Sequence, residues 1–239
     1  MNESLYRFVS WGFQDLIWGG DLLDADHLPD HGPAVFVSNH LGPLGPIAVG
    51  ASLPFFLHPW IHANMLDPRL APDYLCRDFV EPTLHISPPV SHWVARGISK
   101  LHVPLLRAIG GIPVYHTTEG LRETLRLTTD LLAQGRYILI FPEDPDLPLD
   151  ARYNMRPFKK GFTRLGELHF ERTGQSLAFY PLAVHAEKRT VRVGDPIRYN
   201  RLLHPAAERQ RIKSMLELSI HRMLLQTSQD GYLSLPLPN

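Results

Sequence analysis

Residues 35–46 read Val-Phe-Val-Ser-Asn-His-Leu-Gly-Pro-Leu-Gly-Pro, and this stretch indicates the fold class. An apolar run that stops at a polar turn is typical of a buried strand whose carboxyl end opens into a loop. In open α/β sheets, ligands and reacting groups gather at the carboxyl ends of the strands. His40 is therefore the first candidate catalytic residue, although a histidine at such a turn more often has only a structural role.

The rest of the chain alternates between strand-like and helix-like patterns, which is typical of an α/β fold. Further strands are expected at residues 112–115, 137–141, 177–184 and 190–193, and helices at residues 95–109, 118–135, 161–173 and 205–226. Thr118 is expected to cap the second of these helices. Residues 47–57 are expected to hold a short helix followed by a strand. The fold class that follows is a central mixed, mostly parallel sheet flanked by helices, with an N-terminal helix.

The pattern divides the chain into an N-terminal segment and one domain. Residues 1–30 are expected to form a helix at residues 4–18 and a turn-rich connector that extends over residues 21–32. That helix has one apolar stripe, so it either lies in a membrane interface or packs on the domain. Residues 31–239 are expected to form one α/β domain. Its proline-rich segment, at about residues 67–92, is expected to be an insertion carrying short helices.

Composition bounds the function further. The 239 residues include 24 Lys and Arg and 24 Asp and Glu, so the formal net charge is zero and no broad nucleic-acid surface is expected. The single Cys76 excludes an intramolecular disulfide. No signal peptide and no apolar run long enough to span a bilayer is visible. We expect a cytoplasmic protein, either free or peripheral at the inner face of the membrane through its N-terminal helix.

Three of the expected strands end in polar residues. These ends are Ser38-Asn39-His40, Tyr115-His116 and the run from Phe141 to Asp146. If the strands are neighbours, the three ends form one cleft. Histidine near carboxylates is the usual arrangement of a general base that activates a hydroxyl or amine. No spacing such as H-E-x-x-H supports a metal site, so none is expected.

The order of these blocks resembles the PlsC-type glycerolipid acyltransferases, which include lysophosphatidic acid acyltransferases. That family carries N-H-x-x-x-x-D after its first strand, then a G-G-x-x-V-x-R-like block, then F-P-E-G-x-R, and finally a strand that opens with Val-Pro or Ile-Pro. The counterparts here are Asn39-His40, residues 110–116 (Gly-Gly-Ile-Pro-Val-Tyr-His), Phe141-Pro142-Glu143 and residues 180–184 (Tyr-Pro-Leu-Ala-Val). The resemblance spans roughly residues 30–200, with the blocks in the family's order.

The resemblance implies a reaction and a set of site residues. In the family, the motif histidine is the general base on an acceptor hydroxyl, which attacks the thioester of acyl-CoA or acyl-carrier protein, and the motif Asp orients it. His40 would be that base, with no tightly bound cofactor and a lipid-like acceptor carrying a hydroxyl or amine. The substrate-binding residues would be Asn39, Gly111, Ile112, Pro113, His116, Phe141, Pro142, Glu143, Lys159 and Lys160.

The sequence departs from the family at the catalytic and phosphate-binding positions. Gly45 stands where the family has the orienting Asp, and His116 where it has the Arg of the second block. Asp144 and Asp146 replace the Gly and Arg of the third block. Two hypotheses remain open. Either Asp144 or Asp146 supplies the missing carboxylate to His40 in a diverged acyltransferase, or the chain is a catalytically silent relative that binds lipid, acyl-CoA or a protein partner.

Overall fold

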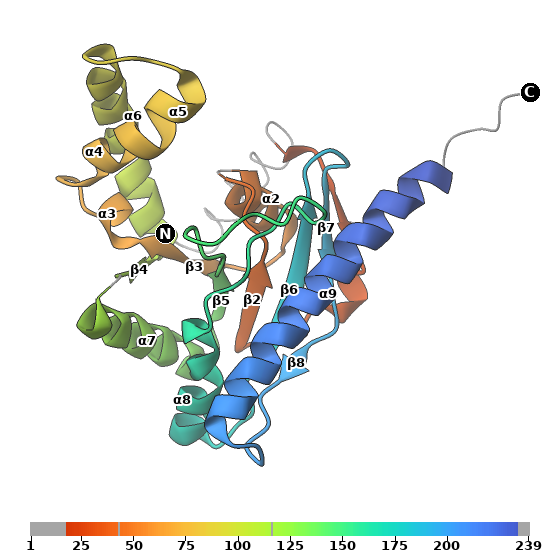
Figure 1. Ribbon diagram of the computed structural model, residues 1–239. Helices are drawn as coiled ribbons and strands as arrows, with labels where there is room; N and C mark the ends of the chain where they lie inside the picture. Colours follow the sequence, from red (N-terminus) through yellow and green to blue (C-terminus); the bar gives the residue numbers. More distant parts are fainter. Residues whose placement is uncertain (1–17, 43, 116, 234–239) are drawn as a thin grey trace, which may run out of the picture.

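The core of the fold is one eight-stranded sheet in the computed structural model, which describes residues 18–42, 44–115 and 117–233 (Figure 1). Its strands are β1 (Asp21–Leu23), β2 (Ala34–Ser38), β3 (Leu57–His62), β4 (Ile112–Val114), β5 (Tyr137–Ile140), β6 (Ala178–His185), β7 (Thr190–Val193) and β8 (Ile197–Arg198). The order is β1-β7-β6-β2-β5-β3-β4, with β8 paired to β6. Only the β6–β7 and β6–β8 pairs in this sheet are antiparallel. The predicted mixed, mostly parallel sheet is confirmed.

Helices flank the sheet on both faces. The helices are α2 (Leu44–Ser52), α3 (Ala63–Leu66), α4 (Ala71–Leu75), α5 (Glu81–Leu84), α6 (Val90–Ala108), α7 (Thr118–Ala133), α8 (Arg164–Thr173) and α9 (Pro205–Leu233). Shorter or wider turns are η2 (Ala25–His27), η3 (Cys76–Val80) and η4 (Gly161–Thr163). Figure 1 shows α9 running diagonally across the strands, with α8 and α7 beside it and α2 behind.

Strand β2 is buried on both sides, which explains its uninterrupted apolar sequence. Val35 and Val37 belong to the hydrophobic cluster that the inner faces of α7, α8 and α9 complete. Phe36 belongs to the opposite cluster, together with Ala48 and Val49 of α2. Successive side chains of a strand point to opposite faces, so a strand between two helical layers must be apolar at every position.

Helices α8 and α9 cover one face of the sheet, and α9 packs on it through an apolar stripe. In α9, Ile212, Leu216 and Ile220 are fully buried at four-residue spacing, and each contributes about 1.5–3 kcal/mol relative to exposure. Helix α8 ends at Gly174, whose positive φ of 72° closes the helix as its sequence predicted.

Three local predictions need correction or lie outside the structure described. The connector at residues 21–32 contains β1, which pairs in parallel with β7; a three-residue strand leaves too short a pattern to recognise. The side chain that caps α7 belongs to Thr117, which accepts a hydrogen bond from the Gly120 N–H at 3.1 Å, and not to Thr118. The predicted helix at residues 4–18 lies almost wholly outside the described residues.

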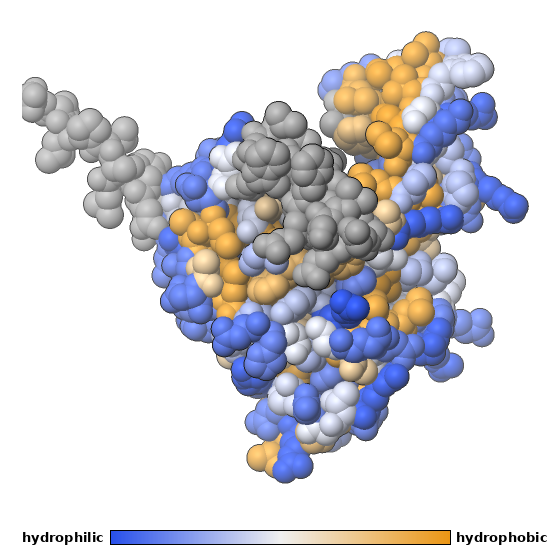
Figure 2. Space-filling model, turned by 180° about the vertical axis from the view of Figure 1, so that it is seen from behind, coloured by the Kyte–Doolittle hydropathy of each residue, from blue (hydrophilic) through white to orange (hydrophobic). Residues whose placement is uncertain are grey.

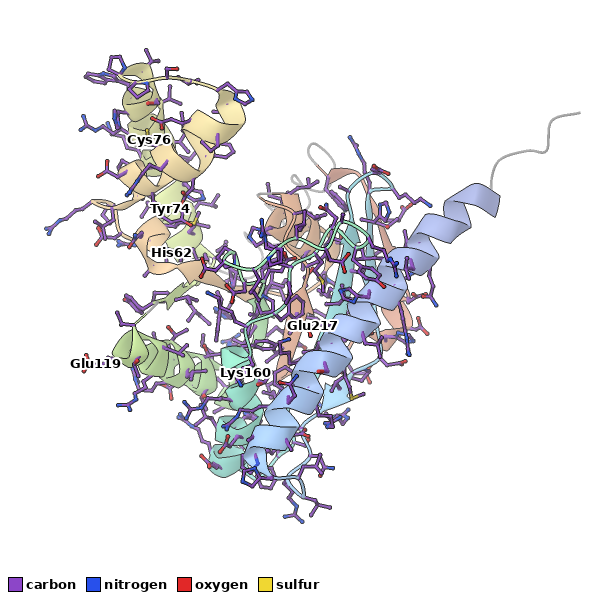
Figure 3. The ribbon with its side chains drawn as sticks, in the orientation of Figure 1. His62, Tyr74, Cys76, Glu119, Lys160 and Glu217 are labelled. Atoms are coloured by element: carbon purple, nitrogen blue, oxygen red, sulfur yellow. The ribbon has the colours of Figure 1, made fainter. Side chains whose placement is uncertain are left out.

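Residues 63–108, which we call the arm, form a helical projection between β3 and β4. Helices α3 to α6 stand away from the sheet at the upper left of Figure 1. The arm has its own small core around Leu75, Cys76, Val80 and Ala95. At its base the His62 ring stacks on the Tyr74 ring, with centroids 4.6 Å apart. Figure 3 shows Cys76 above this pair. Residues 67–92, where the sequence predicts an insertion with short helices, lie within the arm, which extends further to include the whole of the 19-residue helix α6.

Candidate active site

Asn39 fixes the turn that follows β2. Its buried side chain accepts a hydrogen bond from the Val184 N–H at 2.8 Å and donates one to the Val184 carbonyl at 3.0 Å. The carboxamide therefore replaces one rung of the ladder between β2 and β6. Because the side chain satisfies both backbone groups of β6, the main chain of β2 is free to turn away. The next residue, His40, then lies at the surface.

His40 sits between the carboxyl ends of β2 and β5, which are neighbouring parallel strands. The backbone N–H of His40 donates a hydrogen bond to Glu143 Oε1 at 2.6 Å. Its ring meets the Phe141 ring edge-on, with centroids 5.3 Å apart and an interplanar angle of 80°. Two predicted strand ends thus meet, and Glu143 holds the backbone of the candidate base in place.

The loop after β5 closes on itself at Glu143. Glu143 Oε2 accepts a hydrogen bond from the Arg156 N–H at 2.9 Å, and Glu143 also forms an isolated bridge with Phe158. The Phe158 N–H donates to Glu217 Oε1 at 2.7 Å, which ties the loop to the middle of α9 (Figure 3). One carboxylate therefore joins His40 to both ends of this loop.

Burial shifts the pKa values of both His40 and Glu143, and the shift at His40 favours a neutral imidazole. Partial burial lowers the pKa of His40 below its ordinary value, so at neutral pH the ring is uncharged and can accept a proton. Burial is also the main influence on Glu143 and raises the pKa of its carboxyl group. The hydrogen bonds from the backbone N–H groups of His40 and Arg156 oppose that rise, and so does the Arg156 charge, because both favour the ionised form of Glu143.

Asp144 and Asp146 are engaged in the turn that follows Glu143. Asp144 Oδ1 lies 3.3 Å from Lys159 Nζ and accepts a hydrogen bond from the Asp146 N–H at 3.2 Å. Among the described residues, no hydrogen bond connects either carboxylate to the His40 ring. The proposed replacement of the missing carboxylate by one of these residues stays a prediction.

Gly45 marks the place of the carboxylate that the family pattern would supply. It is buried in the first turn of α2. A Cβ atom built on it would lie 3.5 Å from Phe141 Cε1 and 3.8 Å from His40 Cα. A side chain at position 45 would therefore adjoin His40 at ordinary contact distances.

The third polar strand end lies farther away than the sequence suggested. Strands β5 and β3 separate β4 from β2, so the axes of β2 and β4 are roughly 14 Å apart. The expectation that three neighbouring strand ends form one cleft is therefore wrong for β4. His116, which follows that strand, lies outside the described residues.

The glycine-rich block before β4 has packing roles in the structure. A Cβ on Gly111 would lie 2.5 Å from Ile61 Cδ1, and one on Gly110 would lie 2.5 Å from His58 Nδ1. Ile112 is buried, and the Pro113 carbonyl accepts a hydrogen bond from Thr124 Oγ1 at 2.7 Å. These contacts explain the residues of the block without a ligand, so their substrate-binding role stays a prediction.

The two lysines after the loop have different surroundings. The Lys159 N–H donates to the Pro142 carbonyl at 2.8 Å, and its ammonium group faces Asp144. Lys160, labelled in Figure 3, is exposed and begins the η4 turn, with no carboxylate partner among the residues that the structure describes. Of the two, Lys160 has the ammonium group that is available to an anionic ligand.

The sequence analysis missed Arg156. The Nη1 of its guanidinium group donates to the carbonyl groups of Leu147 and Pro145, and its backbone N–H donates to Glu143. A cation therefore lies beside the carboxylate that positions His40. The signal was weak, because Arg156 is separated from Glu143 by the whole loop and only the Pro-, Asp- and Asn-rich turns between them suggest that the loop folds back.

The chain matches no protein-family model and none of the curated proteins. Its fold is similar to the crystal structure of the 1-acyl-sn-glycerophosphate (LPA) acyltransferase PlsC from Thermotoga maritima, with a TM-score of 0.53 and 11% sequence identity. The match covers 95% of this chain and 82% of that one. At this identity the comparison establishes a shared α/β fold.

Two features that the described residues lack bear on the site. No group of three or more His, Cys, Asp or Glu side chains is placed to hold a metal ion within the described ranges. Nor does any helix in the described part of the chain have the length and apolar character needed to cross a bilayer.

Proposed function

We propose that this protein is an acyltransferase, with His40 as the general base. The observation that carries the proposal is the position of His40 at the carboxyl edge of a PlsC-like sheet. There the backbone N–H of His40 donates a hydrogen bond to Glu143 at 2.6 Å. The lowered pKa of His40 supports it as well, because only a neutral imidazole accepts a proton.

The reaction follows from what a neutral histidine can do beside a thioester. An imidazole nitrogen of His40 takes the proton of an acceptor hydroxyl or amine while the acceptor atom attacks the thioester carbonyl carbon. The carbon–sulfur bond then breaks, and the leaving thiolate receives the proton that His40 holds. The products are an ester or amide and a free thiol, and His40 returns to its neutral form.

The surroundings of the site favour particular substrates. We propose acyl-CoA or acyl-carrier protein as the donor, with exposed Lys160 facing its phosphate groups. Lys159 is less suited because Asp144 already neutralises it. For the acceptor we propose a lipid-like alcohol or amine. Asp146 is exposed and would repel a simple lysophosphate, whereas it would attract an amine.

A second function is supported by one observation, which is that no carboxylate bonds to the His40 ring among the described residues. In serine proteases, a histidine base without its orienting carboxylate loses roughly ten-thousandfold in rate. A silent relative that keeps the fold to bind acyl-CoA, lipid or a protein partner would have no need of that carboxylate.

Incubation with labelled acyl-CoA and a panel of lysolipid, glycolipid and amine acceptors distinguishes the two functions. The enzyme hypothesis expects a labelled product from the wild type and at least a hundredfold less from His40→Ala, on the order of a general base's contribution. His31→Ala is the matched control, because His31 is an exposed histidine before the amino end of β2. Stoichiometric acyl-CoA binding with no product from any acceptor would instead identify the silent relative.

A further inference from the structure

Helix α6 presents an apolar face to solvent. Trp93 is 72% exposed and Leu101 is 77% exposed, and Val90 and Pro104 are exposed as well. Figure 2 shows hydrophobic side chains gathered over the arm, at the upper right of that view. The opposite side of the same helix has Ser91, Ala95, Ser99 and Val103 buried, and Val94 and Ile98 pack against the core of the arm. Trp93 and Leu101 thus lie on the side that faces away from that core.

The same face carries positive charge. Arg96, Lys100 and Arg107 are exposed, and at 3.6 residues per turn they fall beside Trp93 and Leu101 within an arc of about 140°. None of these cations has an ion pair among the described residues. We call this set of exposed α6 side chains the α6 face.

The charge of the α6 face differs from that of the chain as a whole. The protein has equal numbers of basic and acidic residues, yet the sequence from Pro82 to Thr118 contains no Asp or Glu. A surface that combines an exposed tryptophan, aliphatic side chains and unpaired cations is complementary to a bilayer with anionic headgroups. A dimer in which two copies met through this face would bring like charges together.

A small cavity adjoins two of the cations. It has a volume of about 290 Å³ and is lined by Lys100 and Arg107, with Pro68, Ser99, Val103 and Pro104 completing the wall. The Nε of Arg107 donates to the Leu66 carbonyl at 2.9 Å, which leaves its two terminal nitrogens for a ligand. The Ser99 hydroxyl donates to the Arg96 carbonyl at 3.0 Å, so the two cations are the groups of this cavity that suit a phosphate.

We infer that the α6 face docks the protein on the surface of a bilayer that contains anionic phospholipid. Trp93 and Leu101 insert at the headgroup level, while Lys100 and Arg107 contact lipid phosphates. The arm rises at the carboxyl edge of the sheet, where β2 ends before His40 (Figure 1). The inference does not depend on acyl transfer, because a silent relative would dock in the same way.

Vesicle sedimentation without any acyl donor tests this inference. The full chain is mixed with vesicles of phosphatidylcholine alone, or of phosphatidylcholine with phosphatidylglycerol. The wild type should bind the mixed vesicles. Trp93→Ser with Leu101→Ser should weaken this binding by at least about tenfold. Arg96→Gln with Lys100→Gln should weaken it about fivefold per charge, with little effect on phosphatidylcholine alone.

The matched control is Leu202→Ser with Arg222→Gln, which removes an exposed leucine and an exposed arginine outside the arm and should bind like the wild type. Circular dichroism checks the fold of each variant, and Lys100→Glu alone gives a second test if a double variant misfolds. The inference is overturned if the wild type does not bind the mixed vesicles, or if the α6 variants bind them as strongly as the wild type does. Light scattering that shows a dimer lost in those variants, with vesicle binding intact, would assign the face to a second copy instead.

Discussion

Gly45→Asp places a carboxylate next to His40, whose ring has no carboxylate partner among the described residues. A Cβ at position 45 would lie 3.4 Å from the Asn39 carbonyl oxygen and 3.8 Å from His40 Cα, which are ordinary contact distances, so the backbone there accepts a Cβ atom without a shift. An acidic residue in the first turn of α2 also interacts favourably with the helix dipole, by about 0.3–1 kcal/mol. The substitution is therefore expected to leave the fold intact.

The expected result is a higher pKa for His40. Burial now lowers that pKa, whereas an opposite charge within about 4–6 Å raises a histidine pKa by about 1–3 units. Because His40 is exposed, solvent screening places the rise at the lower end of that range, which corresponds to about 1.4 kcal/mol in favour of the imidazolium. If the proposed function is right, acyl transfer should rise as well, because the imidazolium that forms during proton transfer is then stabilised.

Two-dimensional NMR of histidine-labelled protein measures this pKa directly. The chain has 13 histidines, so a His40→Gln spectrum assigns the resonance. Gly45→Asn is the matched control, since it adds a side chain of the same size without the charge and should leave the pKa close to that of the wild type.

An unchanged His40 pKa in a folded Gly45→Asp protein would refute the argument that position 45 faces the base. A different result in the wild type would also be informative. If His40 already titrates above its ordinary range there, a carboxylate pairs with it in solution, and Asp144 and Asp146 become the residues to replace by Asn.

Two further predictions concern stability. Asn39→Ala leaves both backbone groups of Val184 without their side-chain partners. It should lower the free energy of unfolding, measured by urea titration, by about 2–4 kcal/mol. The control is Asn64→Ala, which should change that free energy little because Asn64 is half-buried and its side chain has no hydrogen bond among the described residues. His169 is buried, neither of its ring nitrogens has a hydrogen-bond partner among the described residues, and burial lowers its pKa. Below about pH 6.5 the unfolded chain binds a proton that the folded protein resists, so stability falls as the pH falls. His169→Leu should reduce this loss and should not weaken the fold at pH 8; an unchanged acid dependence of the melting temperature would contradict this.

Much of the secondary structure could be predicted because its signals are local. Val35, Phe36 and Val37 predict a strand whatever surrounds them, since an apolar run between turn residues has few alternatives. The stripe through Ile212, Leu216 and Ile220 likewise predicts α9, although not its full length. Strand β1 was not predicted, because three residues are too few to show an alternating pattern. Its strand status depends on a partner, β7, far along the chain.

The candidate site was only partly predictable, because its contacts join distant segments. The resemblance of short blocks singled out His40 and Glu143, and the fold brings them within one hydrogen bond. It did not indicate that Glu143 acts on the backbone of His40, that Lys159 engages Asp144, or that Arg156 returns to the same carboxylate. Such pairings depend on strand order and loop path, which no local pattern encodes.

By itself, then, the sequence determined that a histidine follows a buried strand in an α/β fold and that Gly stands at position 45, where the family that the sequence blocks resemble carries an Asp. Only the tertiary structure decided which groups surround that histidine. The order of the strands brings β5 next to β2 and leaves β4 two strands beyond them. The physical reason is that periodicity follows from the chain's own backbone geometry, whereas the neighbours of a side chain follow from how separate elements bury their apolar faces together.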